Sequence, residues 1–126
     1  MFGPLGIRSV ELELDAAGYF VGGYGADMTA RDFARFGLLY ARDGVWDGER
    51  LLPEGWVDYA RSPSSTSKGY GSGFWLSDNT FAAAGLLGQR VVVAPEEDLV
   101  MVVLASDLNT ERIQVLLEDL GEPFRG

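Results

Sequence analysis

The sequence predicts an α+β fold: an antiparallel sheet of about four strands, with a C-terminal helix on one face and two N-terminal helices. Two observations predict this class. Apolar residues recur at helical spacing after residue 29 and again near residue 113. Between residues 70 and 104 the apolar runs are short and are separated by turn residues, as in consecutive strands. A chain of 126 residues with 47% hydrophobic residues suits a single domain over 1–126.

The first 28 residues are predicted to be rich in loops. They contain one short alternating stretch at Val10, Leu12 and Leu14, and a glycine-rich run follows it. Residues 29–62 form the predicted helical part. Thr29 can cap a helix and Asp32 suits its first turn, while Gly44 can end it.

Two further features belong to the helical part. Pro53 suits the first position of a second short helix, which would contain Trp56, Val57 and Ala60. The charged residues Arg31, Asp32 and Arg35 are interpreted as a solvated helix face or as an inter-helix ion pair.

Residues 70–126 form the predicted sheet and terminal helix. Connections this short between four strands predict an antiparallel meander. The last two strands are apolar on both faces, which indicates cover on both sides of the sheet. A terminal helix that Asn109 or Thr110 can cap would cover one face, through Ile113, Leu116, Leu117 and Leu120. The second face needs the earlier helices, a partner chain or sequence outside this chain.

Composition excludes several classes of chemistry. Without cysteine or histidine there is no Ser-His-Asp triad, no Cys-His pair, no disulfide and no zinc site of the usual kind. We expect no metal and no cofactor, and Glu96, Glu97 and Asp98 are interpreted as a hairpin turn. The net charge of −9 disfavours nucleic acid and anionic membranes as partners, and no run is long enough to span a bilayer.

Several segments together resemble one known family. They occur in the family's order along nearly the whole chain: Met28–Tyr40, Asp43–Trp56, Tyr70–Leu76, Ala84–Gln89 and Ala94–Val100. The chain resembles the penicillin-recognising serine hydrolases of the β-lactamase superfamily, and most of all the branch of class C-like esterases and 6-aminohexanoate-oligomer hydrolases. The resemblance implies a partial β-lactamase/transpeptidase-like fold.

In that family an acyl-enzyme mechanism uses three motifs: Ser-x-x-Lys, Tyr-x-Asn, and Lys/His-Thr/Ser-Gly on a strand. The resemblance places Ala83, Ala84 and Gly85 at the third motif. It nominates the backbone N–H of Leu86 for the oxyanion hole. The two alanines replace polar side chains that hold a β-lactam carboxylate, which favours an esterase or amidase over a β-lactamase.

Two aromatic residues complete the predicted substrate-binding set. Trp75 lies on the strand predicted beside the third motif, and Tyr24 lies on the glycine-rich loop. Packing is the alternative interpretation for both side chains.

The first two motifs are not found in functional form. Ser65 and Lys68 have the Ser-x-x-Lys spacing, but they lie in a predicted polar loop. A lysine acts as the base only where burial lowers its pKa, and an exposed loop does not provide that burial. No tyrosine is followed two residues later by asparagine.

Two functions follow as expectations. The chain would be the C-terminal part of a hydrolase of small esters or amides, inactive until an N-terminal part supplies serine, lysine and tyrosine. Alternatively, it would be a non-catalytic module derived from that fold, which binds a ligand or partner. An exposed strand edge and apolar face would produce a homodimer, partial disorder of residues 1–28 or poor solubility.

Overall fold

The computed structural model describes residues 1–106 and 110–121. Within these residues the chain is α+β with antiparallel sheets, as predicted. The helices are α1 (Ala30–Ala41), α2 (Trp56–Arg61) and α3 (Thr110–Gly121), with short 3₁₀ turns η1 (Leu86–Gly88) and η2 (Pro95–Glu97). The strands are β1 (Glu11–Leu12), β2 (Ala26–Asp27), β3 (Val45–Trp46), β4 (Glu49–Arg50), β5 (Trp75–Leu76), β6 (Phe81–Ala84), β7 (Arg90–Ala94) and β8 (Leu99–Val103).

Helix α1 begins and ends where its local sequence directs. The Thr29 hydroxyl accepts the backbone N–H of Asp32 at 3.3 Å, which satisfies one donor that the first turn leaves free. At the other end Gly44 adopts a φ of 77° and donates its N–H to the Leu39 carbonyl at 2.7 Å. Both predicted boundary signals are confirmed.

Helix α2 begins later than the sequence predicts. Pro53 lies in a turn whose carbonyl accepts the N–H of Trp56, and the helix starts at Trp56. Gly55 takes the left-handed conformation with a φ of 77°, which a helical residue cannot have. The left-handed glycine therefore sets the start of α2, and Pro53 does not.

The four-stranded sheet has the order β5-β6-β7-β8, with every neighbouring pair antiparallel. The predicted meander is therefore confirmed. The register places Phe81 opposite Val93 and Ala83 opposite Val91, and Met101 lies opposite Val92 on β8. Successive side chains alternate between the two faces of the sheet.

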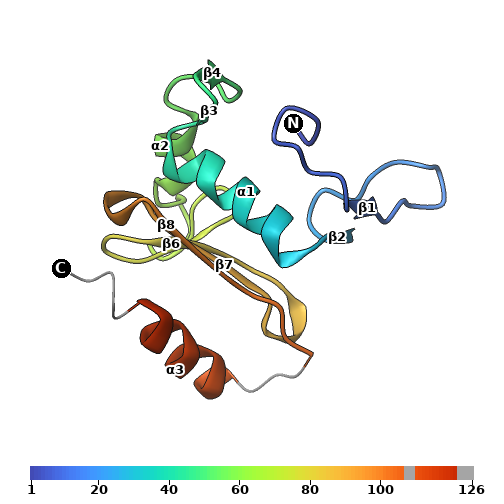
Figure 1. The fold of residues 1–126 in the computed structure, drawn as a ribbon. Helices are drawn as coiled ribbons and strands as arrows, with labels where there is room; N and C mark the ends of the chain where they lie inside the picture. The colour runs from blue at the N-terminus through green and yellow to red at the C-terminus, as the bar shows by residue number, and fades with distance from the viewer. Residues whose placement is uncertain (107–109, 122–126) are drawn as a thin grey trace.

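Helices cover both faces of this sheet, with α1 on one side and α3 on the other (Figure 1). The α1 side forms the main core, in which buried residues from helices and strands meet: Tyr40, Val57, Ala60, Phe74, Phe81, Val91 and Val93. On the other side, Val103 of β8 packs with Ile113 and Leu117 of α3. Helix α1 therefore supplies cover for the second face, one of the possibilities that the sequence left open.

The beginning of the chain packs against the outer side of α1. Leu5 is 1% exposed and Ile7 is 5% exposed, and both join Leu39 in a second apolar cluster. The sequence did not predict this docking, because an irregular segment carries no periodicity that identifies its buried residues.

Two points concern the limits of the described chain. The predicted cap residue Asn109 and the side chain of Thr110 lie outside the described residues. No helix in the described part of the chain is long and apolar enough to cross a membrane.

Candidate functional site

The sequence-predicted site lies on the hairpin that joins β6 to β7 through η1. The N–H of Gly85 donates to the Gln89 carbonyl at 2.9 Å and continues the strand pairing beyond Ala84. Leu87 and Gly88 then take positive φ values of 59° and 91°, which fold the chain back tightly. Gly85 itself is extended, with φ −104° and ψ 174°.

Gln89 fixes this hairpin to the end of β8. Its side-chain Nε2 donates to the Ala105 carbonyl at 2.6 Å, and its Oε1 accepts the Ala105 N–H at 3.0 Å. These two hydrogen bonds from one side-chain amide hold the hairpin against the backbone of Ala105, just after β8. Gln89 belongs to the pattern that carries the resemblance, but no local pattern in the sequence predicts this positioning role.

The strand pairing determines which backbone groups face outward. In an antiparallel ladder, residues that exchange hydrogen bonds alternate with residues that point away. Because Gly85 bonds to Gln89, Ala83 also faces β7, whereas the N–H and C=O of Ala84 face the other edge. Extended Gly85 carries the alternation on to the N–H of Leu86, which also points away from β7.

This outer edge of β6 is open beyond its first two residues. Within the described residues, strand β5 pairs with only two residues of β6, Phe81 and Ala82. Within the described part of the chain, the N–H of Leu86 donates no hydrogen bond, and the Leu86 side chain is 82% exposed. The arrangement presents a free backbone donor at an accessible position.

The side chains of the predicted set separate onto two faces. Ala83 packs against the main core beneath α1. Ala84 is exposed, and Trp75 lies directly opposite Ala82, so both point to the α3 face. Trp75 is 56% exposed and its ring contacts Tyr70 edge-on, with centroids 5.0 Å apart. The exposed candidates are therefore Ala84, Gly85, Leu86 and Trp75, and Ala83 contributes from the core side.

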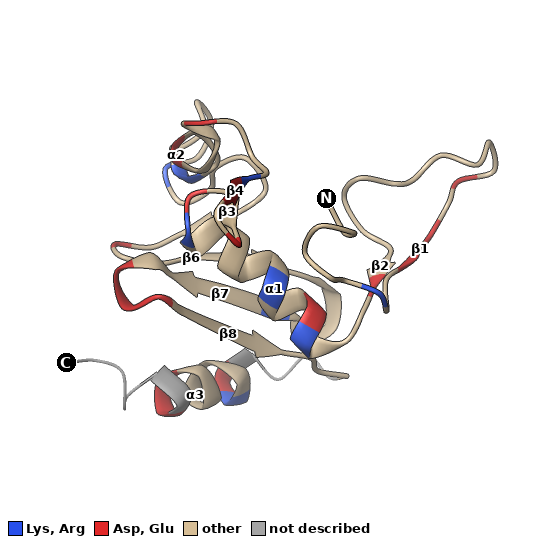
Figure 2. Ribbon diagram, turned by 45° about the horizontal axis from the view of Figure 1, so that its top comes forward, with Lys and Arg blue, Asp and Glu red and all other residues tan. Residues whose placement is uncertain are grey.

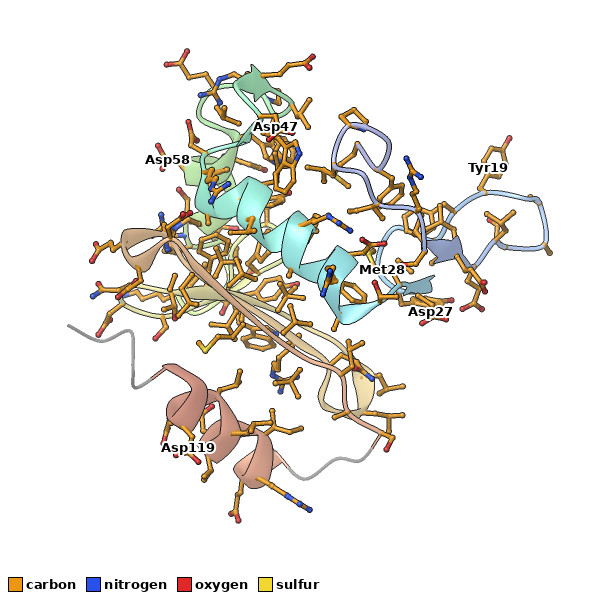
Figure 3. All side chains as sticks on the ribbon, viewed as in Figure 1. Tyr19, Asp27, Met28, Asp47, Asp58 and Asp119 are labelled. Atoms are coloured by element: carbon orange, nitrogen blue, oxygen red, sulfur yellow. The ribbon has the colours of Figure 1, made fainter. Side chains whose placement is uncertain are left out.

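Tyr24 lies on the long loop between β1 and β2. Figure 1 shows this loop projecting away from the four-stranded sheet, and Figure 3 shows Tyr19 of the same loop pointing outward. The side chain of Tyr24 is 65% exposed. A substrate contact by Tyr24 stays a prediction.

The Ser-x-x-Lys sequence at Ser65 lies in an exposed loop between α2 and β5. Ser65 and Lys68 are both exposed and neither belongs to a helix. The loop is held by Ser64, whose hydroxyl donates to the Ser67 carbonyl and accepts the Ser67 N–H. Ser65 and Lys68 therefore lack the buried helix start that the chemistry requires.

A buried carboxylate lies at the start of α1. Asp32 is 4% exposed and accepts hydrogen bonds from the Ser9 hydroxyl at 2.6 Å and from the backbone N–H groups of Ser9 and Arg8. Arg35 forms an ion pair with its other oxygen. The interpretation of Asp32 as part of a solvated helix face was wrong. Its carboxylate is buried and holds residues 8 and 9 against α1 through hydrogen bonds.

These donors change the acidity of Asp32. The Ser9 hydroxyl bond, with the N–H groups and Arg35, outweighs the opposing effect of burial and lowers the pKa of Asp32 from 3.8 to about 2. A carboxyl with a lowered pKa in the folded state stabilises the fold above its unfolded pKa. That stabilisation is lost as the pH falls from about 4 towards 2.

We therefore expect Asp32→Asn to remove part of the acid sensitivity of folding. The unfolded state of the native chain takes up a proton on Asp32 before the folded state does, whereas asparagine cannot titrate. Urea midpoints measured across the acid range should converge for the two proteins as the pH approaches 2. Parallel pH profiles would contradict the role of Asp32 as an ionised clamp.

Among residues 1–106 and 110–121, no group of three or more carboxylates could hold a metal ion. In the described structure, the turn at Glu96, Glu97 and Asp98 connects β7 to β8. Asp98 forms a two-pronged ion pair with Arg42, at 3.0 Å and 2.9 Å, which ties this turn to the end of α1.

Comparison of the fold identifies its class. No family model matches the chain. A solved structure from Bacillus anthracis, described as a 6-aminohexanoate-dimer hydrolase, matches 91% of this chain with a TM-score of 0.70 at 19% identity. Another from Bacteroides dorei, described as a β-lactamase, matches 94% with a TM-score of 0.66 at 14% identity. The fold is that of β-lactamase-like hydrolases.

The sequence comparison agrees with this class. The 6-aminohexanoate-dimer hydrolase of Paenarthrobacter ureafaciens is 30% identical over an aligned stretch of 115 residues, and the match covers 79% of this chain. The chain is thus related to the serine hydrolases of the β-lactamase superfamily, as the sequence predicted. It spans 29% of the length of that curated relative, and 34% and 48% of the two solved chains.

Proposed function

We propose that this chain forms the C-terminal portion of a serine hydrolase that cleaves small esters or amides through an acyl-enzyme. The observation that carries the proposal is the N–H of Leu86 at the open end of β6, which points outward and donates no hydrogen bond within residues 1–106 and 110–121. The names of two relatives, both 6-aminohexanoate-dimer hydrolases, support an amide substrate.

In this proposal Leu86 acts through its backbone. A serine from the remaining part of the hydrolase attacks the substrate carbonyl, and negative charge develops on the carbonyl oxygen. The Leu86 N–H donates to that oxygen and stabilises the transition state. Collapse expels the alcohol or amine and leaves the acyl-enzyme, which water then hydrolyses.

The rigidity of the hairpin supports this role. A hydrogen-bond donor stabilises the transition state most when it already points at the position of the oxyanion, because the protein then does not have to rearrange during the reaction. The Gly85 bond to Gln89 and the two Gln89 bonds to Ala105 hold the segment on both sides of Leu86. The Leu86 side chain is largely exposed, which agrees with a role in which only the backbone N–H of Leu86 takes part.

The test replaces the matched region of the Paenarthrobacter hydrolase with this chain and follows hydrolysis of a short-chain p-nitrophenyl ester. Leu86→Pro removes the N–H at the first position of a 3₁₀ turn, where proline fits. We expect kcat to fall by about 10²–10³. Leu86→Ala keeps the N–H and should retain most of the activity.

The isolated chain provides the complementary control. We expect it to hydrolyse no ester, and Ser65→Ala should change nothing. Full activity of Leu86→Pro in the chimera would contradict the oxyanion role. Hydrolysis by the isolated chain that disappears in Ser65→Ala would contradict the need for an external nucleophile. A chimera that folds but stays inactive would favour the non-catalytic binding module.

A further inference from the structure

Leu87, the residue after the proposed oxyanion donor, has an unusual backbone conformation. Among residues 1–106 and 110–121, four residues other than glycine have a positive φ, and three of them are aspartates: Asp43, Asp47 and Asp98. Aspartate tolerates the left-handed conformation because its short polar side chain can hydrogen-bond to the nearby backbone. The fourth is Leu87, with a φ of 59° and a ψ of 19°. A leucine has no such compensation, so its backbone is strained.

The turn itself gives no reason for a leucine at this position. Leu87 and Gly88 are the central residues of the turn from Leu86 to Gln89, and both have a positive φ. The Gln89 N–H closes this turn by donating to the Leu86 carbonyl at 3.5 Å. Two successive residues with positive φ are typical of a tight hairpin turn, for which Asn-Gly is a preferred pair. Asparagine or glycine in place of Leu87 would form the same turn with less strain.

Core packing does not explain the leucine either. The Leu87 side chain is 41% exposed, and it belongs to none of the three apolar clusters in the described part of the chain. Strained residues concentrate at active sites and at contacts with ligands, where the strain serves the function. Leu87 directly follows Leu86, so the strained leucine lies at the candidate site.

We propose that the Leu87 side chain binds the apolar acyl chain of the substrate. This inference rests on the proposed function, in which the Leu86 N–H lies about 3 Å from the carbonyl oxygen of the substrate. Successive Cα atoms are about 3.8 Å apart, so a leucine at position 87 can reach the methylene groups next to that carbonyl. The acyl group stays attached to the carbonyl carbon in both steps of the reaction, whereas the alcohol or amine departs after the first. Leu87 can therefore contact the acyl chain throughout the reaction.

The charge distribution agrees with an apolar ligand at this hairpin. No residue from Phe81 to Gln89 carries a charge, and the neighbouring Leu86 side chain is also exposed. The turn at the other end of β7 is different, because it contains Glu96 and Glu97, which lie in the red loop between β7 and β8 in Figure 2. Each methylene group that an apolar side chain covers adds to binding. We therefore expect discrimination by the length of the acyl chain.

The first measurement tests the strain in the isolated chain. We expect Leu87→Asn to raise the urea midpoint, because asparagine relieves the left-handed backbone and no core contact is lost. Leu116→Asn is the matched control: Leu116 is 44% exposed but lies in helix α3, where asparagine has a lower helix propensity than leucine. The control should therefore not raise the midpoint. An unchanged or lower midpoint for Leu87→Asn would show that the leucine supports the fold, and would overturn the proposal.

The second measurement tests the chain-length preference in the chimera with the Paenarthrobacter hydrolase. The substrates are p-nitrophenyl acetate and p-nitrophenyl hexanoate. We expect Leu87→Asn to lower the ratio of kcat/KM for the hexanoate to kcat/KM for the acetate by about tenfold. Leu116→Asn should keep the ratio of the unsubstituted chimera. Equal losses for both esters would overturn the role of Leu87 and leave the proposed function standing, whereas an unsubstituted chimera that hydrolyses neither ester would overturn both.

Discussion

Phe81→Ala is expected to lower the free energy of unfolding more than an ordinary point substitution does. The side chain is 1% exposed and lies at the centre of the main core. Its ring meets Phe74 edge-on at 5.1 Å and Tyr40 at 6.4 Å, and the Arg61 guanidinium lies 5.1 Å from its centroid. Truncating a buried phenylalanine costs about 3–5 kcal/mol. Small domains have a net stability of about 5–15 kcal/mol, so this loss is a substantial share of the total.

Chemical unfolding followed by tryptophan fluorescence measures this loss. Phe81→Leu retains most of the apolar volume and should lose much less stability than Phe81→Ala. Tyr24→Ala removes an aromatic ring that is 65% exposed and should change the midpoint little. A midpoint for Phe81→Ala close to that of Tyr24→Ala would show that the core is not organised around this ring.

The elements that the sequence predicted are those fixed by neighbouring residues. Thr29 caps α1 three residues before Asp32, and Gly44 ends it, because both devices act within one or two turns. The strands of the meander pair with their neighbours along the chain, so short turns were sufficient evidence for their order. Local chemistry determines these features.

The features that the sequence missed depend on contacts between distant segments. Leu5 and Ile7 become core residues only because Leu39 lies beneath them. Asp32 was visible as a first-turn acid, but its burial depends on Ser9, which reaches it from 23 residues away. No periodic pattern encodes either contact.

The candidate site shows the same division. The resemblance nominated Leu86, but the outward direction of its N–H follows from the register between Gly85 and Gln89. The register also places Ala83 and Trp75 on opposite faces, although the sequence grouped them in one substrate-binding set. A one-residue change in pairing would reverse both assignments, so the sequence alone could not make them.

Gly71→Ala is the second substitution for which we expect a large effect. Gly71 is buried where the chain passes the last turn of α2. A Cβ atom built on it would lie 2.2 Å from the Ala60 carbonyl oxygen and 3.0 Å from that of Ser62. These are backbone atoms, which cannot rotate away as a side chain can. The same Ala60 oxygen accepts the N–H of Ser72 at 3.0 Å, so relief of the clash should also strain this hydrogen bond.

Overpacking of this kind costs about 1–3 kcal/mol and occasionally more, and we expect Gly71→Ala to lie at or above the upper end. Gly69→Ala is a close control, because a Cβ atom at Gly69 meets nothing within 4 Å. At an open glycine that tolerates a side chain, alanine stabilises by about 0.4–1 kcal/mol by restricting the unfolded chain. Urea unfolding with equal slopes should therefore move the two midpoints in opposite directions. Equal midpoints would mean that the α2 turn yields freely to the added methyl group, and that the close approach of Gly71 to Ala60 contributes little to holding α2 against the sheet.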